Sequence, residues 1–155
     1  RHLDYPPARL GPEARVSQNI ICNGCEIGGS IAHSILSRGV VVEEGAEVVD
    51  SVLLGEVWVK KGARVHRAIL DERAVIGEGA VVGDGEDNTP NRDEPDVLNT
   101  GLTLVGEGAR VPRGAVVGRN CRIAPGARRE DFPEGGILPS GSCVEAEAVT
   151  AGSQG

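Results

Sequence analysis

Three consecutive stretches of this sequence, residues 31–47, 48–64 and 65–81, align without gaps at a period of 17 residues. Aliphatic residues recur in three columns and divide each unit into steps of five, six and six residues. The columns are Ile31–Val48–Val65–Val82, Leu36–Leu53–Leu70 and Val42–Val59–Ile76. Sequence repeats of this length are typical of solenoids, in which each unit stacks on the next.

The residue two before each column member is small or β-branched, as at Ser34, Ser51 and Ala68 before the leucine column. Because strand side chains alternate, residues i and i−2 share one face. Each short strand is therefore predicted to point one large and one small side chain inward. Glycines such as Gly45 and Gly62 fall between the strands, where a positive φ is easiest for glycine. The sequence predicts an all-β, three-sided solenoid of short parallel strands, with coils about 4.8 Å apart.

The repeat pattern resembles the hexapeptide-repeat family, and this resemblance implies a left-handed parallel β-helix. Steps of six continue through Val105, Val111, Val117 and Ile123, so we expect about seven coils between residues 10 and 144. The polar stretch 83–101 interrupts the steps and is predicted to be a long inserted loop. We expect residues 1–9 to be an interdomain linker and residues 145–155 to be a flexible tail.

Composition excludes several classes of function. The net charge of −7 argues against binding to nucleic acid or to an anionic membrane as the main activity. No apolar run reaches the length of a membrane span, and no secretory signal opens the sequence. Four scattered cysteines do not suit a disulfide scaffold. We therefore expect a cytoplasmic protein with no membrane or nucleic-acid partner.

The residue just before each column member is predicted to point outward, and two of the three walls then carry apolar ladders. These six residues are Ile35, Val52 and Ile69 on one wall and Val41, Trp58 and Val75 on another. Ladders of this kind indicate an interface, although outward β-branched residues also satisfy strand propensity. The third wall carries Glu47, Arg64 and Val81.

Basic residues cluster on one coil, between Lys60 and Arg67. Two interpretations remain open for this cluster. Arg64 and Arg67 could bind an anionic effector. Alternatively, they could pair with Glu47 and Asp50 of the preceding coil in a charge-balanced ladder.

The residues offer no clear catalytic constellation, and we predict no catalytic residue and no metal site. A hexapeptide-repeat acyltransferase would need a general-base histidine, for which His33 and His66 are the candidates. Cys22 and Cys25 form a C-x-x-C spacing that could hold zinc or a redox dithiol. The repeat register instead predicts Cys25 at a small inward site and Cys22 in a turn. The glycines precede no helix, so a nucleotide-binding loop is not expected.

Several stretches resemble the C-terminal β-helix domain of bacterial ADP-glucose pyrophosphorylases, also called glucose-1-phosphate adenylyltransferases. They are YPPARLGPEARVSQNIICNGCEI, SVLLGEVWVKKGARVHRAILDERAVIGEGAVVGD and NTPNRDEPDVLNTGLTLVGEGARVPRGAVVGRNCRI, followed by DFPEGGILPSGSCV. Together these stretches cover nearly the whole chain.

This resemblance implies a non-catalytic domain for oligomerisation and allostery, within an enzyme that makes ADP-glucose from ATP and glucose 1-phosphate for glycogen synthesis. The implied partners are an N-terminal catalytic domain, expected to precede Arg1 and to bind Mg²⁺, and further subunits of a homotetramer. A sugar-phosphate or nucleotide effector is also implied, with Arg64 and Arg67 in the coil associated with effectors. Two alternatives stay open: a hexapeptide-repeat acyltransferase, and the β-helix domain of another sugar-1-phosphate nucleotidyltransferase.

Overall fold

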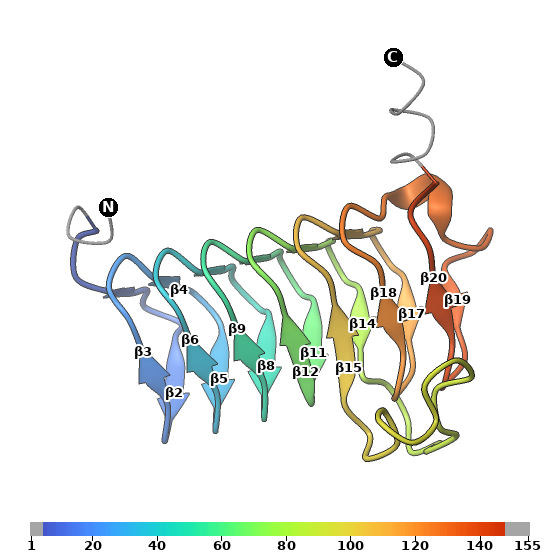
Figure 1. The fold of residues 1–155 in the computed structure, drawn as a ribbon. Coiled ribbons are helices and arrows are strands. Elements are labelled where there is room, and N and C mark those ends of the chain that lie inside the picture. The colour runs from blue at the N-terminus through green and yellow to red at the C-terminus, as the bar shows by residue number, and fades with distance from the viewer. Residues whose placement is uncertain (1–4, 148–155) are drawn as a thin grey trace.

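The computed structural model describes residues 5–147 and confirms the predicted all-β solenoid. Short strands stack into three parallel sheets, which form the three walls seen in Figure 1. Sheet A contains β1 (Arg9–Leu10), β4 (Glu26–Ile27), β7 (Val41–Val42), β10 (Trp58–Val59), β13 (Val75–Ile76) and β16 (Arg110–Val111). The chain visits sheets A, B and C in turn, so each coil contributes one strand to each wall.

The other two sheets have seven strands each among the described residues. Sheet B contains β2 (Arg15–Ser17), β5 (Ser30–Ala32), β8 (Glu47–Val49), β11 (Arg64–His66), β14 (Val81–Val82), β17 (Val116–Val117) and β19 (Ile137–Leu138). Sheet C contains β3 (Ile20–Ile21), β6 (Ile35–Leu36), β9 (Val52–Leu53), β12 (Ala68–Leu70), β15 (Thr103–Val105), β18 (Arg122–Ile123) and β20 (Cys143–Val144). Six coils are therefore complete and a seventh has two strands, which agrees with the expected number.

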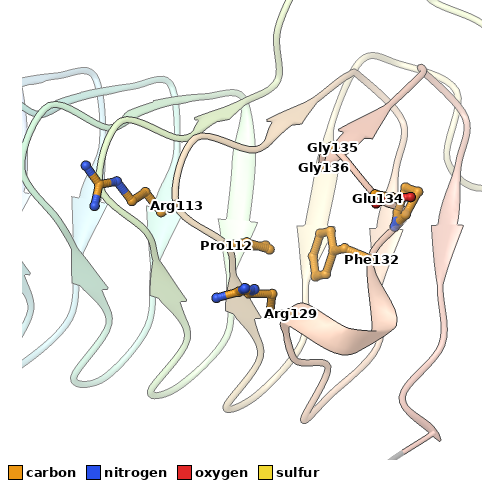
Figure 2. A pocket seen from close by; sticks show the side chains of 8 residues that line it. Pro112, Arg113, Arg129, Phe132, Glu134, Gly135 and Gly136 are labelled. Carbon is orange, nitrogen blue, oxygen red and sulfur yellow. The ribbon is translucent and has the colours of Figure 1, made fainter.

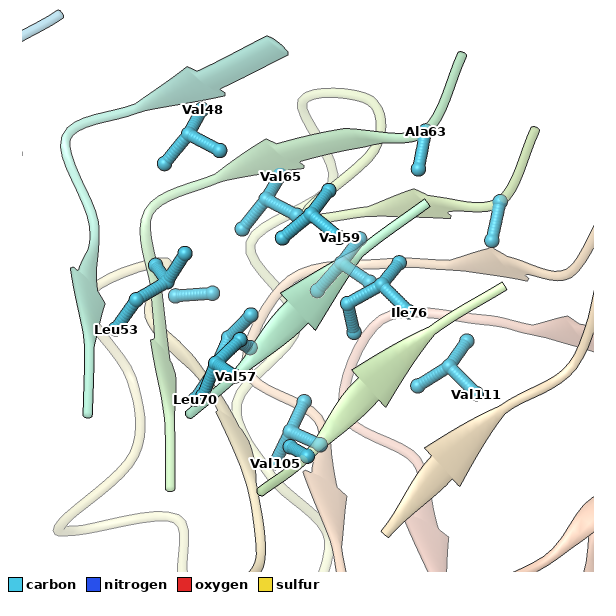
Figure 3. Packing of buried hydrophobic residues seen from close by; sticks show 14 of the residues in the cluster. Val48, Leu53, Val57, Val59, Ala63, Val65, Leu70, Ile76, Val105 and Val111 are labelled. Carbon is cyan, nitrogen blue, oxygen red and sulfur yellow. The ribbon is translucent and has the colours of Figure 1, made fainter. Parts of the chain in front are cut away.

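Strand register follows the sequence columns. Val65 pairs with Val48 and Val82, and Leu53 pairs with Leu36 and Leu70. These column residues fill the interior between the walls, as Figure 3 shows for Val48, Leu53, Val59, Val65 and others. Because each large side chain stacks on an equivalent one, a core almost without aromatic rings is still fully buried.

The small inward sites are also occupied as predicted. Ala46, Ala63 and Ala80 are buried in successive coils, and Cys25 holds the equivalent place earlier in the chain. Ser34 and Ser51, which lie two residues before Leu36 and Leu53, are also buried. The hydroxyl oxygen of Ser34 accepts from the backbone N–H of Ser51 at 3.0 Å, and that of Ser51 accepts from Ala68 at 3.1 Å. The buried hydroxyls are thus satisfied by the next coil.

The last described coil departs from the pattern. A 3-10 helix, η2 (Arg129–Asp131), stands where a seventh strand of sheet A would be. Phe132 follows it and is buried against the core. The sequence columns did not predict this helix, because it lies between two coils that otherwise keep the six-residue step.

The stretch 83–101 connects β14 to β15 without forming a strand or helix. This inserted loop lies back against the later coils and is held by two fully buried asparagines, Asn91 and Asn120. Asn91 donates to the carbonyls of Asn120 at 3.0 Å and Ser142 at 3.4 Å. Asn120 donates to Asn88 and Thr89 and accepts from the N–H of Gly101.

The predicted linker and tail lie partly outside the described residues, since 1–4 and 148–155 are not described. The remaining linker residues run directly into β1, which begins at Arg9. Across the described part of the chain, no helix is long and apolar enough to cross a membrane.

Candidate functional site

A cleft of about 340 Å³ lies where sheet B meets the inserted loop. Arginines and carboxylates line it in equal number: Arg64, Arg67 and Arg119 with Asp50, Asp84 and Glu86. Both arginines predicted as effector ligands therefore line one cleft. The cleft also contains groups from the loop and from a later coil, which the repeat pattern alone did not connect.

Arg64 and Arg67 are positioned by the solenoid backbone. Arg64 points outward from β11, while Arg67 lies just after this strand at the corner between sheets B and C, with φ of 52°. The N–H of Arg67 donates to Val49 of the preceding coil, and its carbonyl accepts from Thr103 beyond the loop, both at 3.0 Å. The corner residue is thus held from both sides.

Of the two interpretations left open for these arginines, the ion pairs with Glu47 and Asp50 are not formed, although Arg64 lies opposite Glu47 in the strand register. Glu47 instead pairs with His66 on the neighbouring strand, with an Nε2–Oε2 distance of 2.8 Å. Asp50 lies 3.8 Å from Nδ1 of His33 in the preceding coil. Among residues 5–147, neither Arg64 nor Arg67 forms an ion pair within 4.0 Å. The strand register places the acidic and basic residues on adjacent coils. The side-chain conformations then bring both carboxylates, Glu47 and Asp50, to histidines and not to the arginines.

Arg119 is the cleft residue that sequence reasoning missed. It comes from the turn before β18, and its Nη1 donates to Oδ1 of Asn88 in the loop at 2.9 Å. The loop can leave the solenoid here because Gly83 (φ 86°) has no side chain; a Cβ at this position would overlap the carbonyl oxygen of His66. No sequence pattern links positions 83, 88 and 119, since only the fold of the loop brings them together.

The cleft combines two kinds of polar group. Arginine guanidiniums match the oxygens of phosphates with several donors in a fixed plane. Carboxylate oxygens accept hydrogen bonds from hydroxyls. A small phosphorylated, hydroxylated ligand fits this mixture better than a bare anion, which the carboxylates would repel.

A larger cavity of about 480 Å³ lies beside η2, and it is a weaker candidate. Pro112, Phe132 and two arginines contribute to its lining. In Figure 2 the guanidiniums of Arg113 and Arg129 lie well apart, so they do not converge on one point between the walls.

The six residues of the predicted apolar ladders all lie outward on their strands. Ile35, Val52 and Ile69 stack on sheet C, and Val41, Trp58 and Val75 stack on sheet A. Ile35 and Trp58 are each 42% exposed. The structure thus places every predicted interface residue on the surface of the predicted wall.

The two ladders differ in length, which the sequence analysis did not show. On sheet C the apolar column continues to Ile20, which is 61% exposed, and to Leu104 on β15. On sheet A the apolar column has only Val41, Trp58 and Val75, because charged residues, Glu26 and Arg110, lie next to it on either side. Sheet B carries Glu47 and Arg64 in its middle and becomes apolar toward its C-terminal end at Val81, Val116 and Ile137.

Polar contacts surround Trp58. Its Nε1 donates to Oε2 of Glu43 at 2.7 Å, and the Nζ of Lys60 lies 4.7 Å from the centre of its ring. Glu43 also accepts from the backbone N–H of Lys61. Lys60 therefore lies over the ring, and it forms no ion pair with a carboxylate of residues 5–147.

The candidate histidines and cysteines do not converge on a reaction centre. His33 contacts Oε1 of Gln18 at 2.6 Å on the surface, whereas His66 lines the cleft and is held there by Glu47. Cys22 is exposed whereas Cys25 is buried, as the register predicted, and burial raises the pKa of the Cys25 thiol. In residues 5–147 no three His, Cys, Asp or Glu side chains gather as metal ligands.

Residues 6–105 match a protein family described as GlmU-like, C-terminal hexapeptide. Curated relatives extend the similarity along the chain. The glucose-1-phosphate adenylyltransferase of Thermomicrobium roseum is 43% identical over 99% of this chain and 36% of its own length. That of Acetivibrio thermocellus is 38% identical over 83% of this chain and 30% of its own length. The chain thus spans about a third of these relatives, in their C-terminal part.

Solved structures share the fold. The acetyltransferase domain of PglB from Neisseria gonorrhoeae, in complex with acetyl coenzyme A, aligns with a TM-score of 0.56 and 22% identity. The alignment covers 92% of this chain and 58% of that one. At this identity the likeness concerns the β-solenoid alone.

Proposed function

The chain belongs to the GlmU-like C-terminal hexapeptide family, and on this premise we propose that it is the non-catalytic β-helix domain of a bacterial glucose-1-phosphate adenylyltransferase. The observation that carries the proposal is the 43% identity to such an enzyme over 99% of this chain. The match confined to about a third of each relative supports a domain that serves a longer enzyme.

The proposed reaction converts ATP and glucose 1-phosphate into ADP-glucose and diphosphate. Its Mg²⁺ and its reacting groups would belong to an N-terminal catalytic domain, and the β-helix would contribute assembly and regulation in the cytoplasm.

Substrate tests on the full-length protein separate this proposal from its relatives. With Mg²⁺, we expect ADP-glucose from ATP and glucose 1-phosphate, and much slower turnover with UTP, CTP, GTP or dTTP or with other sugar 1-phosphates. Preference for a different nucleotide or sugar would assign the chain to another sugar-1-phosphate nucleotidyltransferase.

The acyltransferase alternative shares the fold, and its candidate base His66 lines the cleft, but the curated relatives that span this chain are adenylyltransferases. We expect no acyl transfer from acetyl coenzyme A to amino-sugar acceptors. Acyl transfer that is lost in His66→Ala or His33→Ala would contradict the proposed function directly.

We also infer that the two apolar ladders contact other parts of a homotetramer, either the catalytic domain or another subunit. Exposed apolar columns of this kind are uncommon on isolated monomers. Trp58→Glu places a second carboxylate beside Glu43 on sheet A. We expect light scattering of the full-length protein to show a smaller oligomer for Trp58→Glu and an unchanged one for Val97→Glu, in the exposed loop. An unchanged oligomer for both variants would contradict the sheet A interface.

The cleft supports a site for a sugar-phosphate or nucleotide effector. Arg64 and Arg67 would bind phosphate, with Arg119 added by the structure, while Asp50, Asp84 and Glu86 would accept from hydroxyls. The absence of ion-paired partners for Arg64 and Arg67 among the described residues leaves these guanidiniums available.

An effector titration tests this assignment. In full-length Arg64→Gln/Arg67→Gln, we expect an unchanged rate without effector and a response to sugar phosphates or AMP shifted to at least about tenfold higher concentration, from two lost charge-assisted contacts. Arg15→Gln is the matched control, because Arg15 is an exposed outward residue of the same sheet. An unshifted response in the double variant would remove these arginines from the site.

A further inference from the structure

The first described residues do not simply lead into the solenoid; they are fixed on its surface. We call residues 5–8 the strap. The carbonyl of Pro6 accepts from the N–H of Gly24 at the corner between sheets C and A. The same bond recurs at this corner in later coils, from Gly39 to Asn23 and from Glu56 to Arg38. The strap therefore occupies the place of one more corner turn, ahead of the first coil.

The Tyr5 side chain anchors the strap across three coils. Its ring lies over Gly24 and Gly39, and its hydroxyl donates to the carboxylate of Glu56 in the following turn. A Cβ at Gly39 would lie 2.9 Å from Cε1 of Tyr5, and one at Gly24 would overlap the ring. Both glycines have positive φ, so the missing side chains form a groove that the ring fills. Three separate turns thus hold a residue that lies outside the repeat.

The place where the strap begins determines where an upstream domain would be tethered to the solenoid. Coils run from sheet A to B to C, so in every later coil the residues that lead into this corner come from sheet C. The strap begins at Tyr5, at the corner where sheets C and A meet, so a domain upstream of the described residues would be tethered beside these two walls. The curated relatives extend well beyond the matched third, which means that a large domain would be tethered at this point.

Sheet C carries the longer of the two apolar ladders. Its ladder, Ile20–Ile35–Val52–Ile69–Leu104, spans about 19 Å of stacked coils without a charged member. Figure 1 shows the strands that carry it, β3, β6, β9, β12 and β15, along one face. The sheet A trio is shorter, and its Trp58 is already bonded to Glu43 and covered by Lys60.

We propose that the sheet C ladder is the docking surface for the polypeptide upstream of Tyr5 in the same chain, with the strap fixing where that polypeptide leaves. The proposal rests on the proposed function, in which this polypeptide is the catalytic domain. A short tether gives a cis domain an effective concentration in the millimolar range, which favours it over a separate copy. Permanent contacts are also the more apolar ones, which suits the long aliphatic ladder. Sheet A then remains for a second copy.

Photo-crosslinking in the full-length protein tests this directly. The probe is Ile69→p-benzoylphenylalanine, whose side chain faces outward at the centre of the ladder. We expect the crosslinked product to keep the mass of one chain on a denaturing gel. Mass spectrometry should then map the crosslink to residues upstream of Tyr5. The control is Val97→p-benzoylphenylalanine, at a loop position that is 73% exposed and away from both ladders.

Two outcomes would overturn the proposal. Crosslinks from position 69 at the mass of two chains would show that another copy covers sheet C. A yield at position 69 no greater than at position 97 would show that the ladder is open. Tyr5→Ala supplies a second reading: with the strap released, the upstream crosslinks should fall several-fold or shift to other peptides. ADP-glucose synthesis by the same preparations reports separately on the proposed function, so the two can fail independently.

Discussion

The uninterrupted coils between Ile31 and Val82 and the later part of the molecule, from Gly83 onward, are stabilised in different ways. In the first region each residue has an equivalent in the next coil. Hydrogen bonds between parallel strands pair the backbone polar groups, and the stacked aliphatic columns form the core. In the second region the stacked strands continue, but single residues with no repeat equivalent hold the inserted loop, above all Asn91 and Asn120. The repeated coils therefore form the walls with their apolar ladders, and the inserted loop forms one side of the cleft.

This difference assigns tasks to the two regions. A stacked wall offers a long, flat, uniform surface, which suits contact with another protein domain. A cleft needs groups of different kinds at one point, and here Asp84 of the loop and Arg119 of a later coil lie beside Arg64 and Arg67. The proposed assembly surface and the proposed effector site thus follow from the regular and irregular parts respectively.

The largest expected effect comes from breaking the repeated region at its core. Leu53→Ala removes a fully buried member of the leucine column and should lower the free energy of unfolding by about 2–5 kcal/mol, measured by urea denaturation. Val52→Ala, the outward neighbour on β9, is the matched control and should cost much less. Equal losses in both variants would mean that the interior is not the source of stability.

A smaller and more local effect is expected in the irregular region. Asn91→Ala leaves the N–H groups of Asp93 and Glu94 without their acceptor and should cost about 1–3 kcal/mol. We expect limited proteolysis to cut within 83–101 in this variant while the repeated coils stay resistant. Asn99→Ala, an exposed asparagine of the same loop, should be cut no faster than the unmodified chain. Cleavage in the repeats first would contradict the comparison.

Acid should affect the last coil through Asp131. Its carboxylate accepts the backbone N–H groups of Arg128 and Glu147, and these bonds lower its pKa below the ordinary 3.8. A lowered folded-state pKa contributes stability that is present above the unfolded value and is lost as pH falls through the folded one. NMR amide shifts of Arg128 and Glu147 should therefore titrate with a midpoint below 3.8.

Asp131→Asn should abolish that titration, whereas Glu130→Gln, its exposed neighbour, should leave the midpoint below 3.8. A midpoint at or above 3.8 would show that the carboxylate does not hold the end of the solenoid.

The mildest test concerns the thiols. At neutral pH a maleimide should modify one thiol per folded chain, the exposed Cys22, because burial raises the pKa of Cys25 and Cys121 and shields them. Cys22→Ser should leave only slow modification. Rapid modification of Cys25, or stoichiometric zinc in the purified protein, would contradict its role as a core residue.

The sequence was sufficient wherever the repeat register determined the answer. The columns, the outward ladders and the burial of Cys25 all follow from steps of five and six residues. Register does not determine rotamers, and so the sequence left two interpretations open for Arg64 and Arg67. In the structure Glu47 pairs with His66 and not with Arg64, which lies opposite it.

Other features lie beyond any local pattern, because they join residues far apart in the chain. Tyr5 reaches Glu56, Asn91 reaches Ser142, and Arg119 reaches Asn88. Each contact depends on how the strap or the loop folds over coils already formed. The cleft and the strap therefore had to be found in the structure, whereas the walls could be predicted.

The central claim is that this domain assembles and regulates an adenylyltransferase without performing chemistry itself. The most direct measurement compares ADP-glucose synthesis from ATP and glucose 1-phosphate, with Mg²⁺, by the full-length protein and by the 155-residue chain alone. We expect ADP-glucose synthesis by the full-length protein and none by the 155-residue chain alone. Synthesis by the isolated chain, or no synthesis by the full-length protein, would contradict it.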